Sequence, residues 1–373
     1  MPVTIDLRKL SDYREAVSQT VDVLAHGELV ILPTETVYGV AARAMDVSAV
    51  TRLVEAKGRP EGKPFALAVA GVDQLAAYVP NWSPLGERLA RRSLPGPVTL
   101  VYDVSHRDSA FWRLPAQVQA WVGAEGTAGF RVPAHEFVLE VLRSLAEPLV
   151  LTSANLSGKP APVTAEESLD QLGDRVALAV DGGPTRYAQP SSVVRVGQSG
   201  FEILRPGVLT EQNLRRLSAP MLLFVCTGNT CRSPMAEAFA RKILGEKLGC
   251  PPDALEEHGI IVSSAGIAAA SGLTASPEAL SAVAVMGIDL HQHQSQPLSE
   301  SLVRCADAIF VMTHGHREEI IHRWPQAASR VHLLHPEGKD IEDPIGGSPE
   351  DYQACAREIE LAVKRRLEEL PFL

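Results

Sequence analysis

The chain is 373 residues long, with 45% hydrophobic residues, 21% charged residues and a formal net charge of −10 at pH 7. This length exceeds what one hydrophobic core usually serves, so we expect two globular domains. The acidic balance lacks the overall basic excess that is typical of proteins binding nucleic acid.

The sequence predicts a cytoplasmic protein without a membrane span. Its apolar runs, such as residues 221–226, are far shorter than the roughly 20 residues needed to cross a bilayer, and its first residues do not resemble a signal peptide. The five cysteines form no CxxC pair. We therefore expect neither a disulfide framework nor a protein-built metal site, and at least one thiol is left for chemistry.

Short apolar runs predict an α/β fold for the first half of the chain. The run at 30–32 predicts a strand, and residues 34–39 predict a loop that enters a helix of small residues. Further apolar runs lie at residues 65–70, 98–102, 149–151 and 176–180. We expect a twisted α/β domain over residues 1–212, followed by a short helix or linker.

We expect the second half of the chain to form a domain over residues 219–373. Its alternation of strands and helices favours a Rossmann-like parallel sheet that is covered by helices on both faces. The predicted strands are residues 221–225, 259–263, 307–312 and 331–334, and the predicted helices include residues 234–244 and 277–286.

A thiol begins the loop between the first strand and the first helix of this second domain. Strand, short loop and helix together aim backbone N–H groups and the positive end of a helix at one point, which makes an anion site. Cys226 and Arg232 stand at its two ends with a CxxxxxR spacing. The N–H groups and the guanidinium would stabilise a thiolate, and the arginine can bind two phosphoryl oxygens in a fork.

Three further features raise this weak spacing signal to a predicted catalytic site. Gly228 and Asn229 stand where the loop must turn tightly, and Ser233 is placed to hydrogen-bond the thiolate. Asp343, followed by a proline, offers a carboxyl group that can protonate a leaving group, although Asp-Pro alone is more often a turn.

Together these residues resemble the low-molecular-weight protein tyrosine phosphatase family, over nearly all of residues 221–373. The resemblance implies that Cys226 is the nucleophile, Arg232 binds phosphate, Asp343 is the general acid, and no cofactor is needed. It also implies a phosphate-binding loop made of Thr227, Gly228, Asn229, Thr230, Cys231 and Ser233. The implied reaction forms a cysteinyl-phosphate and then hydrolyses it.

The substrate of this second domain is left open between protein phosphoarginine and phosphotyrosine. Thr230, where tyrosine-directed members usually carry a large aliphatic residue, is similar to the bacterial protein-arginine phosphatases and favours phosphoarginine. Alternatives are an arsenate reductase, for which only Cys305 lies in the matching region, and a redox sensor in which Cys231 forms a reversible disulfide with Cys226.

The first domain carries two polar segments that suit a nucleotide. Residues 57–63 place three cations in seven residues, and residues 152–158 supply hydroxyls and an amide after a predicted strand. Alone, each is as compatible with a solvated turn. Their combination with the motifs at 33–39, 95–100, 131–133, 181–183, 191–194 and 205–207 resembles the YrdC family of threonylcarbamoyl-AMP synthases, over residues 10–210.

This resemblance implies a concave cavity in which L-threonine, bicarbonate and ATP give threonylcarbamoyl-AMP and pyrophosphate, for modification of tRNA. The implied ATP-binding residues are Lys57, Arg59, Ser153, Asn155 and Arg205, and the implied threonine-binding residues are Thr36, Arg131 and Ser191. Magnesium is expected to accompany the triphosphate. A partner enzyme would transfer the threonylcarbamoyl group to tRNA.

The first domain could instead be a non-catalytic module that binds nucleotide or RNA. The His-x-His pairs at 291–293 and 314–316 have no third ligand in sequence, so surface positions or contacts that support other side chains are favoured over a metal site.

Overall fold

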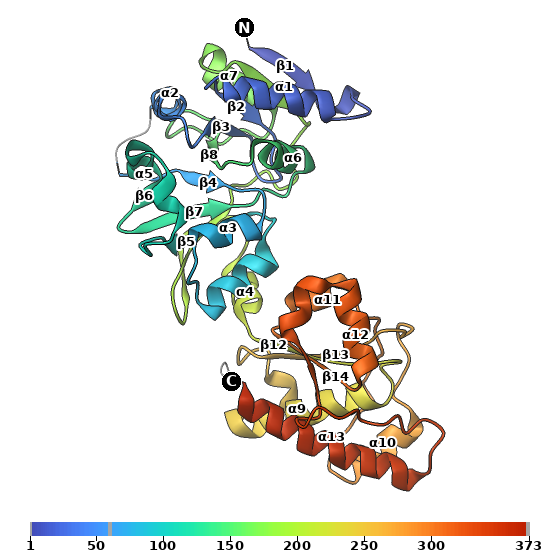
Figure 1. The fold of residues 1–373 in the computed structure, drawn as a ribbon. Helices are drawn as coiled ribbons and strands as arrows, with labels where there is room; N and C mark the ends of the chain where they lie inside the picture. Colours follow the sequence, from blue (N-terminus) through green and yellow to red (C-terminus); the bar gives the residue numbers. More distant parts are fainter. Residues whose placement is uncertain (1, 59–61, 371–373) are drawn as a thin grey trace. The chain divides into compact units, whose positions relative to one another are not determined.

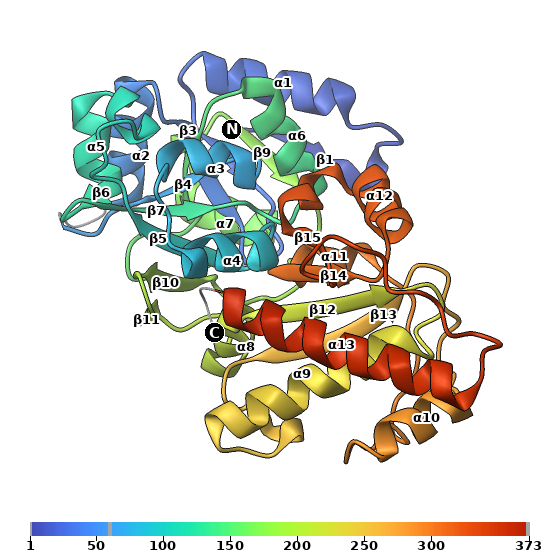
Figure 2. The same cartoon turned by 60° about the horizontal axis from the view of Figure 1, so that its bottom comes forward.

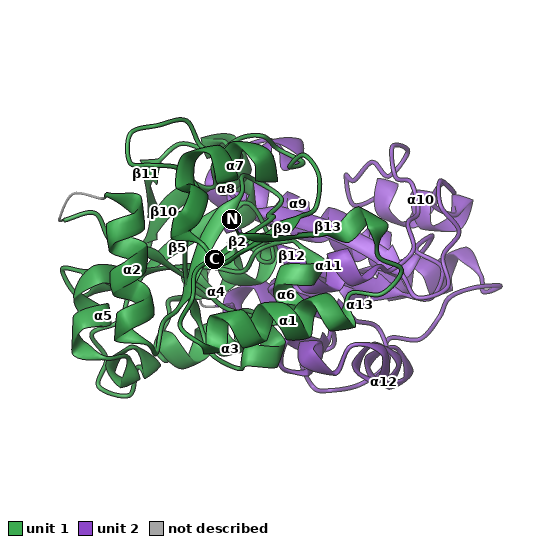
Figure 3. Ribbon diagram, turned by 90° about the horizontal axis from the view of Figure 1, so that it is seen from above, with its two compact units in different colours: residues 1–217 green, residues 218–373 purple. Residues whose placement is uncertain are grey.

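The computed structural model describes residues 2–58 and 62–370. The chain divides into two compact units, residues 1–217 and 218–373, which Figure 3 distinguishes by colour. The helix α8 (Glu211–Ser218), at the end of unit 1, buries Leu214 in the core of that unit.

Unit 1 is built on one mixed sheet of eleven strands among its described residues (Figure 1). The strand order is β1-β9-β2-β3-β8-β4-β7-β5-β10-β11, and β6 pairs with β7. The strands are β1 (Val3–Asp6), β2 (Val30–Leu32), β3 (Gly39–Arg43), β4 (Ala66–Ala68), β5 (Val98–Asp103), β6 (Gly123–Ala124), β7 (Thr127–Arg131), β8 (Leu149–Ser153), β9 (Leu178–Asp181), β10 (Ser192–Val196) and β11 (Phe201–Arg205).

Helices cover both faces of this sheet. Alternate residues of β2 enter different cores, because successive side chains of a strand point to opposite faces: Ile31 joins one cluster, and Val30 and Leu32 join the other. Helices α1 (Arg14–Ala25) and α6 (Glu136–Leu145) lie side by side on the second of these faces (Figure 2). The first face carries α2 (Val47–Lys57), α3 (Val72–Tyr78), α4 (Pro84–Ser93), α5 (Ala116–Val122), α7 (Ala165–Leu172) and α8.

One element differs from the sequence prediction. Residues 39–43, expected to begin a helix, form β3, which pairs antiparallel with β2 and β8. Small residues are needed here because the strand is buried on both faces: Ala41 and Ala42 are fully buried in different cores. A Cβ on Gly39 would lie 2.7 Å from Leu151 Cδ1. Packing between strands therefore overrides the helix propensity of alanine.

Unit 2 contains a four-stranded parallel sheet in the order β13-β12-β14-β15, as the alternating pattern predicts. Its strands are β12 (Met221–Cys226), β13 (Ile261–Gly266), β14 (Ala308–Val311) and β15 (Val331–Leu333). Its helices are α9 (Arg232–Leu248), α10 (Pro277–Ala284), α11 (Glu300–Cys305), α12 (His314–Arg323) and α13 (Pro349–Glu369).

The central strand β12 places the predicted phosphate-binding loop. Leu222 and Phe224 pack against α9, α10 and α13, while Leu223 and Val225 pack against α11 and α12 on the other face (Figure 1). The neighbours β13 and β14 lie on opposite sides of β12. Its carboxyl end is therefore the point where the strand order reverses, and α/β sheets bind ligands at such a crevice.

Candidate active sites

The loop of unit 2 folds tightly between β12, which ends at Cys226, and α9, which begins at Arg232. Asn229 adopts a left-handed φ of 56°, which asparagine tolerates better than most residues. Gly266, at the end of β13, lets the loop approach closely, since a Cβ there would lie 2.5 Å from the carbonyl oxygen of Thr227. The loop thus rests directly on the neighbouring strand.

The Cys226 thiol is 3% exposed and lies at the floor of this loop. Its Sγ atom is 3.0 Å from the hydroxyl of Ser233, and the backbone N–H of Asn229 donates to it at 3.3 Å. Both contacts bring a hydrogen-bonding polar group directly against the sulfur. The first turn of α9 adds the positive end of its dipole.

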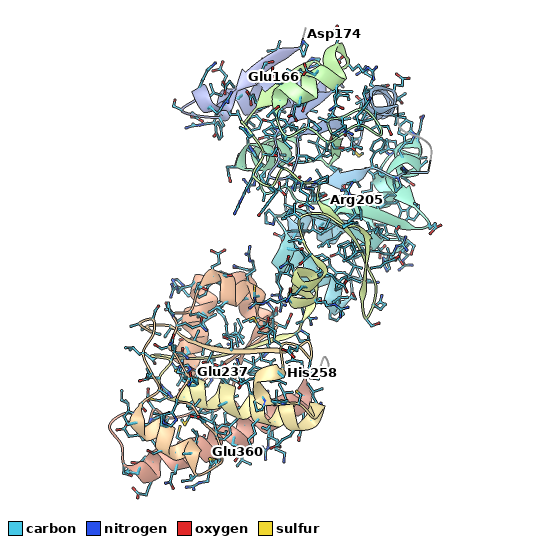
Figure 4. The ribbon with its side chains drawn as sticks, turned by 180° about the vertical axis from the view of Figure 1, so that it is seen from behind. Glu166, Asp174, Arg205, Glu237, His258 and Glu360 are labelled. Carbon is cyan, nitrogen blue, oxygen red and sulfur yellow. The ribbon has the colours of Figure 1, made fainter. Side chains whose placement is uncertain are left out.

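A directed chain of hydrogen bonds supports the thiol from behind. Glu237, carried by α9 (Figure 4), accepts from the hydroxyl of Ser264 at 2.7 Å and from Arg241 at 2.9 Å. Because a carboxylate only accepts, Ser264 must donate to it and accept from the amide of Asn229 at 2.8 Å. The same amide nitrogen donates to Ser233 at 2.9 Å, and the Ser233 hydroxyl lies within hydrogen-bond distance of both the Ala265 carbonyl oxygen, at 3.3 Å, and the thiol.

Arg232 and Asp343 form an ion pair across the mouth of the loop. The guanidinium is buried, and its NH1 group donates to the carbonyl oxygen of Ile341 at 2.9 Å while NH2 contacts the Asp343 carboxylate. The Asp343 side chain is 39% exposed. An incoming phosphoryl group would compete for the same guanidinium, which would free the carboxyl group to act on the leaving atom.

The other loop residues face different surroundings. Thr227 is exposed, and its hydroxyl oxygen lies 2.9 Å from Nε2 of His316. Thr230 is half-buried, and its carbonyl oxygen accepts from the backbone N–H of Ser276 at 2.9 Å. The buried Cys231 thiol donates to the Ser276 hydroxyl at 3.4 Å. Gly228, partly exposed, completes the turn without a side chain.

In each of the two His-x-His pairs, one histidine contacts the loop and the other is exposed at the surface. His293 lies 2.7 Å from the carbonyl oxygen of Asn229 and His316 contacts Thr227, whereas His291 and His314 are exposed beside aspartates. Within residues 2–58 and 62–370, no group of three or more His, Cys, Asp or Glu side chains is arranged to hold a metal ion. The contacts of His293 and His316 with the loop were not specified from sequence.

Unit 1 contains a cavity of about 780 Å³ over the sheet strands. Six of the eight predicted binding residues line it: Lys57, Arg131, Ser153, Asn155, Ser191 and Arg205. Thr36 is fully buried behind Arg131 rather than in the wall, and Arg59 lies outside the described residues. The cavity is large enough for a nucleotide or drug-sized ligand.

Lys57 forms the polar centre of one end of the cavity. It is the last residue of α2 and is 3% exposed. Its Nζ atom donates to the carbonyl oxygen of Ser153 at 2.6 Å and to Asn155 Oδ1 at 3.0 Å, and also contacts the Asn155 carbonyl. The Ser153 hydroxyl donates to the same Asn155 oxygen at 2.5 Å. These contacts hold a positive charge, a hydroxyl and an amide together where β8 ends.

Arg131 is fixed by one end of its guanidinium group. NH2 donates to Thr36 Oγ1 at 2.7 Å, to Glu35 Oε1 at 2.8 Å and to Thr34 Oγ1 at 3.3 Å, and the second Glu35 oxygen accepts from the Ala134 N–H at 3.1 Å. Its buried Nε has no hydrogen-bond partner within the described part of the chain. A buried donor of this kind costs about 1–3 kcal/mol when unpaired, so a ligand acceptor would be favoured.

Ser191 and Arg205 stand together in the cavity wall. Arg205, on β11 (Figure 4), donates to the Ser191 carbonyl oxygen at 2.8 Å. The Ser191 hydroxyl lies 3.1 Å from that of Thr99. Burial, followed by repulsion from Arg131, lowers the pKa of Arg205. The two guanidinium groups therefore act on the same space, which suits an anionic ligand.

Several cavity residues were missed from sequence. Thr34 and Arg195 also line the cavity, and the buried Glu35 carboxylate holds Arg131. Lys63, one of the three cations that suit a nucleotide in the sequence, lines the cavity as well. The motif at residues 33–39 contains Thr34 and Glu35, but the resemblance implies a binding role only for Thr36. The signal that could have found Glu35 is an acidic residue directly after an apolar strand, which needs a cationic partner if buried.

Comparisons with known proteins match both units. The Sua5/YciO/YrdC family model, described as telomere recombination, matches residues 22–207. The model for low molecular weight phosphotyrosine protein phosphatase matches residues 221–371.

Curated relatives match the first part of the chain. The threonylcarbamoyl-AMP synthase of Pyrococcus abyssi is 35% identical over 194 residues, which are 52% of this chain and 54% of that protein. The Vibrio cholerae threonylcarbamoyl-AMP synthase is 34% identical over 198 residues, which are 52% of this chain and 98% of that protein. The chain thus spans little more than half the length of the Pyrococcus protein.

Solved structures also resemble this chain. Pyrococcus abyssi Sua5 in complex with L-threonine has a TM-score of 0.52 at 22% identity, covering 71% of this chain and 92% of that one, which is a likeness of fold alone. The YwlE arginine phosphatase of Geobacillus stearothermophilus is 36% identical, with a TM-score of 0.35 and coverage of 40% and 92%. We conclude that the chain belongs to the Sua5/YciO/YrdC family of threonylcarbamoyl-AMP synthases in its first unit and to the low molecular weight phosphotyrosine protein phosphatase family in its second.

Proposed function

We propose that the chain is a bifunctional enzyme whose first unit joins L-threonine, bicarbonate and ATP to give threonylcarbamoyl-AMP and pyrophosphate. The observation that carries this proposal is Arg131, whose buried guanidinium is held at NH2 and leaves Nε without a partner among the described residues. A carboxylate is the natural acceptor for such a group. Thr36 orients the guanidinium at 2.7 Å, and Ser191 offers a hydroxyl from the cavity wall.

The nucleotide would occupy the end of the cavity that Lys57 marks. Lys57, Ser153 and Asn155 are linked by hydrogen bonds there, and Arg205 adds a cation from β11. Arg59, outside the described residues, belongs to the same proposal through its sequence motif. Magnesium would arrive on the triphosphate, since the described residues offer no carboxylate cluster for it.

The test of this function is pyrophosphate release. Release that requires threonine and bicarbonate together, in addition to ATP, would support a synthase. Nucleotide binding without such release would favour the alternative, a non-catalytic module that binds nucleotide or RNA. The product of the first unit would be a small molecule, so a second protein would have to transfer the threonylcarbamoyl group to tRNA.

The second unit would hydrolyse phosphorylated protein side chains through Cys226. The thiolate attacks phosphorus, the bond from phosphorus to the leaving atom breaks, and Asp343 gives that atom a proton. Water then attacks phosphorus, returns a proton to Asp343 and releases the thiolate. The contacts of the Cys226 Sγ atom with Ser233 and the Asn229 N–H carry this proposal, and Arg232 would stabilise the phosphoryl oxygens.

Phosphoarginine is the proposed substrate in preference to phosphotyrosine. Thr230 is half-buried in the loop, and its hydroxyl can orient a guanidinium-bound phosphate. Turnover of matched phosphoarginine and phosphotyrosine peptides tests this preference, with Cys226→Ser as the inactive control. Equal turnover that Thr230→Ile leaves unchanged would contradict it.

An arsenate reductase is the alternative for this unit. That chemistry relays electrons through further cysteines, and Cys305 and Cys355 are the other thiols of interest. Cys355 is buried, and burial raises the pKa of its thiol to about 12. A thiol so hard to ionise is a poor electron relay. Thioredoxin-coupled arsenate reduction by the wild type, absent from Cys226→Ser, would support this alternative.

A further inference from the structure

The proposed phosphatase reaction makes no use of the side chain that directly follows the nucleophile. Thr227 is exposed at the mouth of the loop, whereas Cys226 lies buried at its floor. Exposed threonines usually rotate freely in water. This one has its hydroxyl oxygen 2.9 Å from Nε2 of His316, a residue that is 89 positions away in the sequence and only 5% exposed.

His316 is itself held in a fixed orientation. It lies in the first turn of α12, where Thr313 is the N-cap residue. The Thr313 hydroxyl oxygen accepts the backbone N–H of His316 at 3.3 Å and lies 3.0 Å from Nδ1 of the same ring. Burial, followed by the charge of Arg232, lowers the pKa of His316 to about 4. The ring is therefore neutral at pH 7, with one donor nitrogen and one acceptor nitrogen.

These contacts fit the tautomer in which the hydroxyl hydrogen of Thr313 is paired with the ring. The Thr313 hydroxyl oxygen accepts the backbone N–H of His316, and the hydroxyl hydrogen of Thr313 can be donated to Nδ1 of the ring. Nε2 then carries the proton and donates to the oxygen of Thr227. The Thr227 hydrogen must point away from the ring, and the described residues provide no second partner for this hydroxyl.

A hydroxyl that meets the leaving group must be accessible where that group departs. In an in-line transfer the leaving atom stands opposite the attacking sulfur, at the mouth of the loop. Thr227 is exposed at that mouth. Asp343, the proposed general acid, contacts Arg232, and the charges of both side chains act on His316.

We propose that the Thr227 hydroxyl is a substrate-binding group, which donates a hydrogen bond to the atom opposite Cys226, and that His316 is its positioning residue. That atom is the leaving atom when the Cys226–phosphorus bond forms and the attacking water when this bond breaks. The inference rests on the proposed phosphatase function. Inorganic phosphate, which places an oxygen in the same position, serves as a probe that needs no turnover.

The experiment measures the affinity of the full-length protein for inorganic phosphate by calorimetry. Thr227→Val keeps the shape of the side chain and removes only the hydroxyl, and His316→Leu removes the imidazole. Each is expected to weaken phosphate binding about tenfold, the loss typical of one hydrogen bond to a charged group. The double variant should lose no more than either single variant, because both remove the same contact.

Two further variants separate positioning from structure. His316→Gln keeps a donor amide near the position of Nε2 and should restore most of the affinity that His316→Leu loses. His322→Gln, an exposed histidine of the same helix, should bind phosphate like the wild type. Thermal unfolding of each variant identifies any loss caused by misfolding, and Thr227→Val, at an exposed position, carries the test if His316→Leu does not fold.

Wild-type phosphate affinity in Thr227→Val would overturn the inference. Additive losses in the double variant would overturn the positioning role of His316. A wild-type protein that binds phosphate but hydrolyses neither phosphoarginine nor phosphotyrosine peptides would contradict the proposed function instead, while the affinity of Thr227→Val would still decide the inference.

Discussion

Gly266→Ala is expected to damage the phosphatase site by moving the backbone of its loop. The added Cβ would lie 2.5 Å from the Thr227 carbonyl oxygen and 2.9 Å from the Asn229 nitrogen. Both are backbone atoms, so no flexible side chain can turn aside. The φ of Gly266 lies outside the left-handed region, so alanine can adopt its conformation and the clash is the only new effect.

Relief of this clash requires the loop to shift by about 1 Å. A displacement of that size costs about 10²-fold in rate when it separates reacting groups. Overpacking of a buried site also destabilises a protein by about 1–3 kcal/mol. We therefore expect turnover of p-nitrophenyl phosphate to fall about 10²-fold, with a lower melting temperature for unit 2.

The assay needs a matched control and an internal reference. Gly315→Ala adds a Cβ whose nearest neighbour, Thr313 Oγ1, lies 3.8 Å away, so it should retain wild-type turnover. Pyrophosphate release by unit 1 should be unchanged in both variants. Wild-type phosphatase turnover by a folded Gly266→Ala protein would refute the reasoning that the loop position depends on this glycine.

Three further predictions concern single side chains. Arg131→Lys should raise the KM for threonine about tenfold while the KM for ATP changes little, because lysine cannot reproduce the planar guanidinium group that Glu35 holds. Steady-state pyrophosphate release measures both KM values, and equal rises in the two would contradict the prediction. Asp343→Asn removes the proposed general acid, so it should slow the turnover of substrates with poor leaving groups more than that of substrates with good leaving groups. Turnover rates across a series of leaving groups measure this difference. An equal effect on all substrates would argue against the role of Asp343 as general acid. The pKa of His316 is about 4 in the folded protein and about 6.5 in the unfolded chain. Between these two values the unfolded chain binds more protons, so the free energy of unfolding falls as the pH drops from 6.5 to 4, by roughly 2 kcal/mol after a discount for partial hydration of the ring. Urea unfolding should detect this loss, and a His316→Gln protein with the same pH dependence would contradict it.

The fold of unit 2 was predictable because its signals are local. Apolar runs of strand length alternate with helical segments, and each predicted strand overlaps an observed one. The loop between Cys226 and Arg232 followed from the same pattern. The surroundings of that loop did not, because His316 reaches Thr227 across 89 positions of sequence, and no local periodicity reports such a contact.

Unit 1 illustrates a different limit of sequence reasoning. The small residues of β3 suggested a helix, since alanine favours helices in isolation. In the folded chain β3 lies between β2 and β8 with both faces covered. Its neighbours in space, rather than its own residues, decide the conformation. The role of Glu35 was hidden for the same reason, because its partner Arg131 is 96 positions away.

No helix within the described residues is long and apolar enough to cross a membrane.

The proposed function places a separate activity in each of the two units. The most direct test measures both activities in the full-length wild type and in two variants, Cys226→Ser and Arg131→Ala. We expect Cys226→Ser to lose phosphatase turnover and keep threonine-dependent pyrophosphate release, and Arg131→Ala to show the reverse. Loss of both activities in either folded variant, or a wild type without one of them, would contradict the claim.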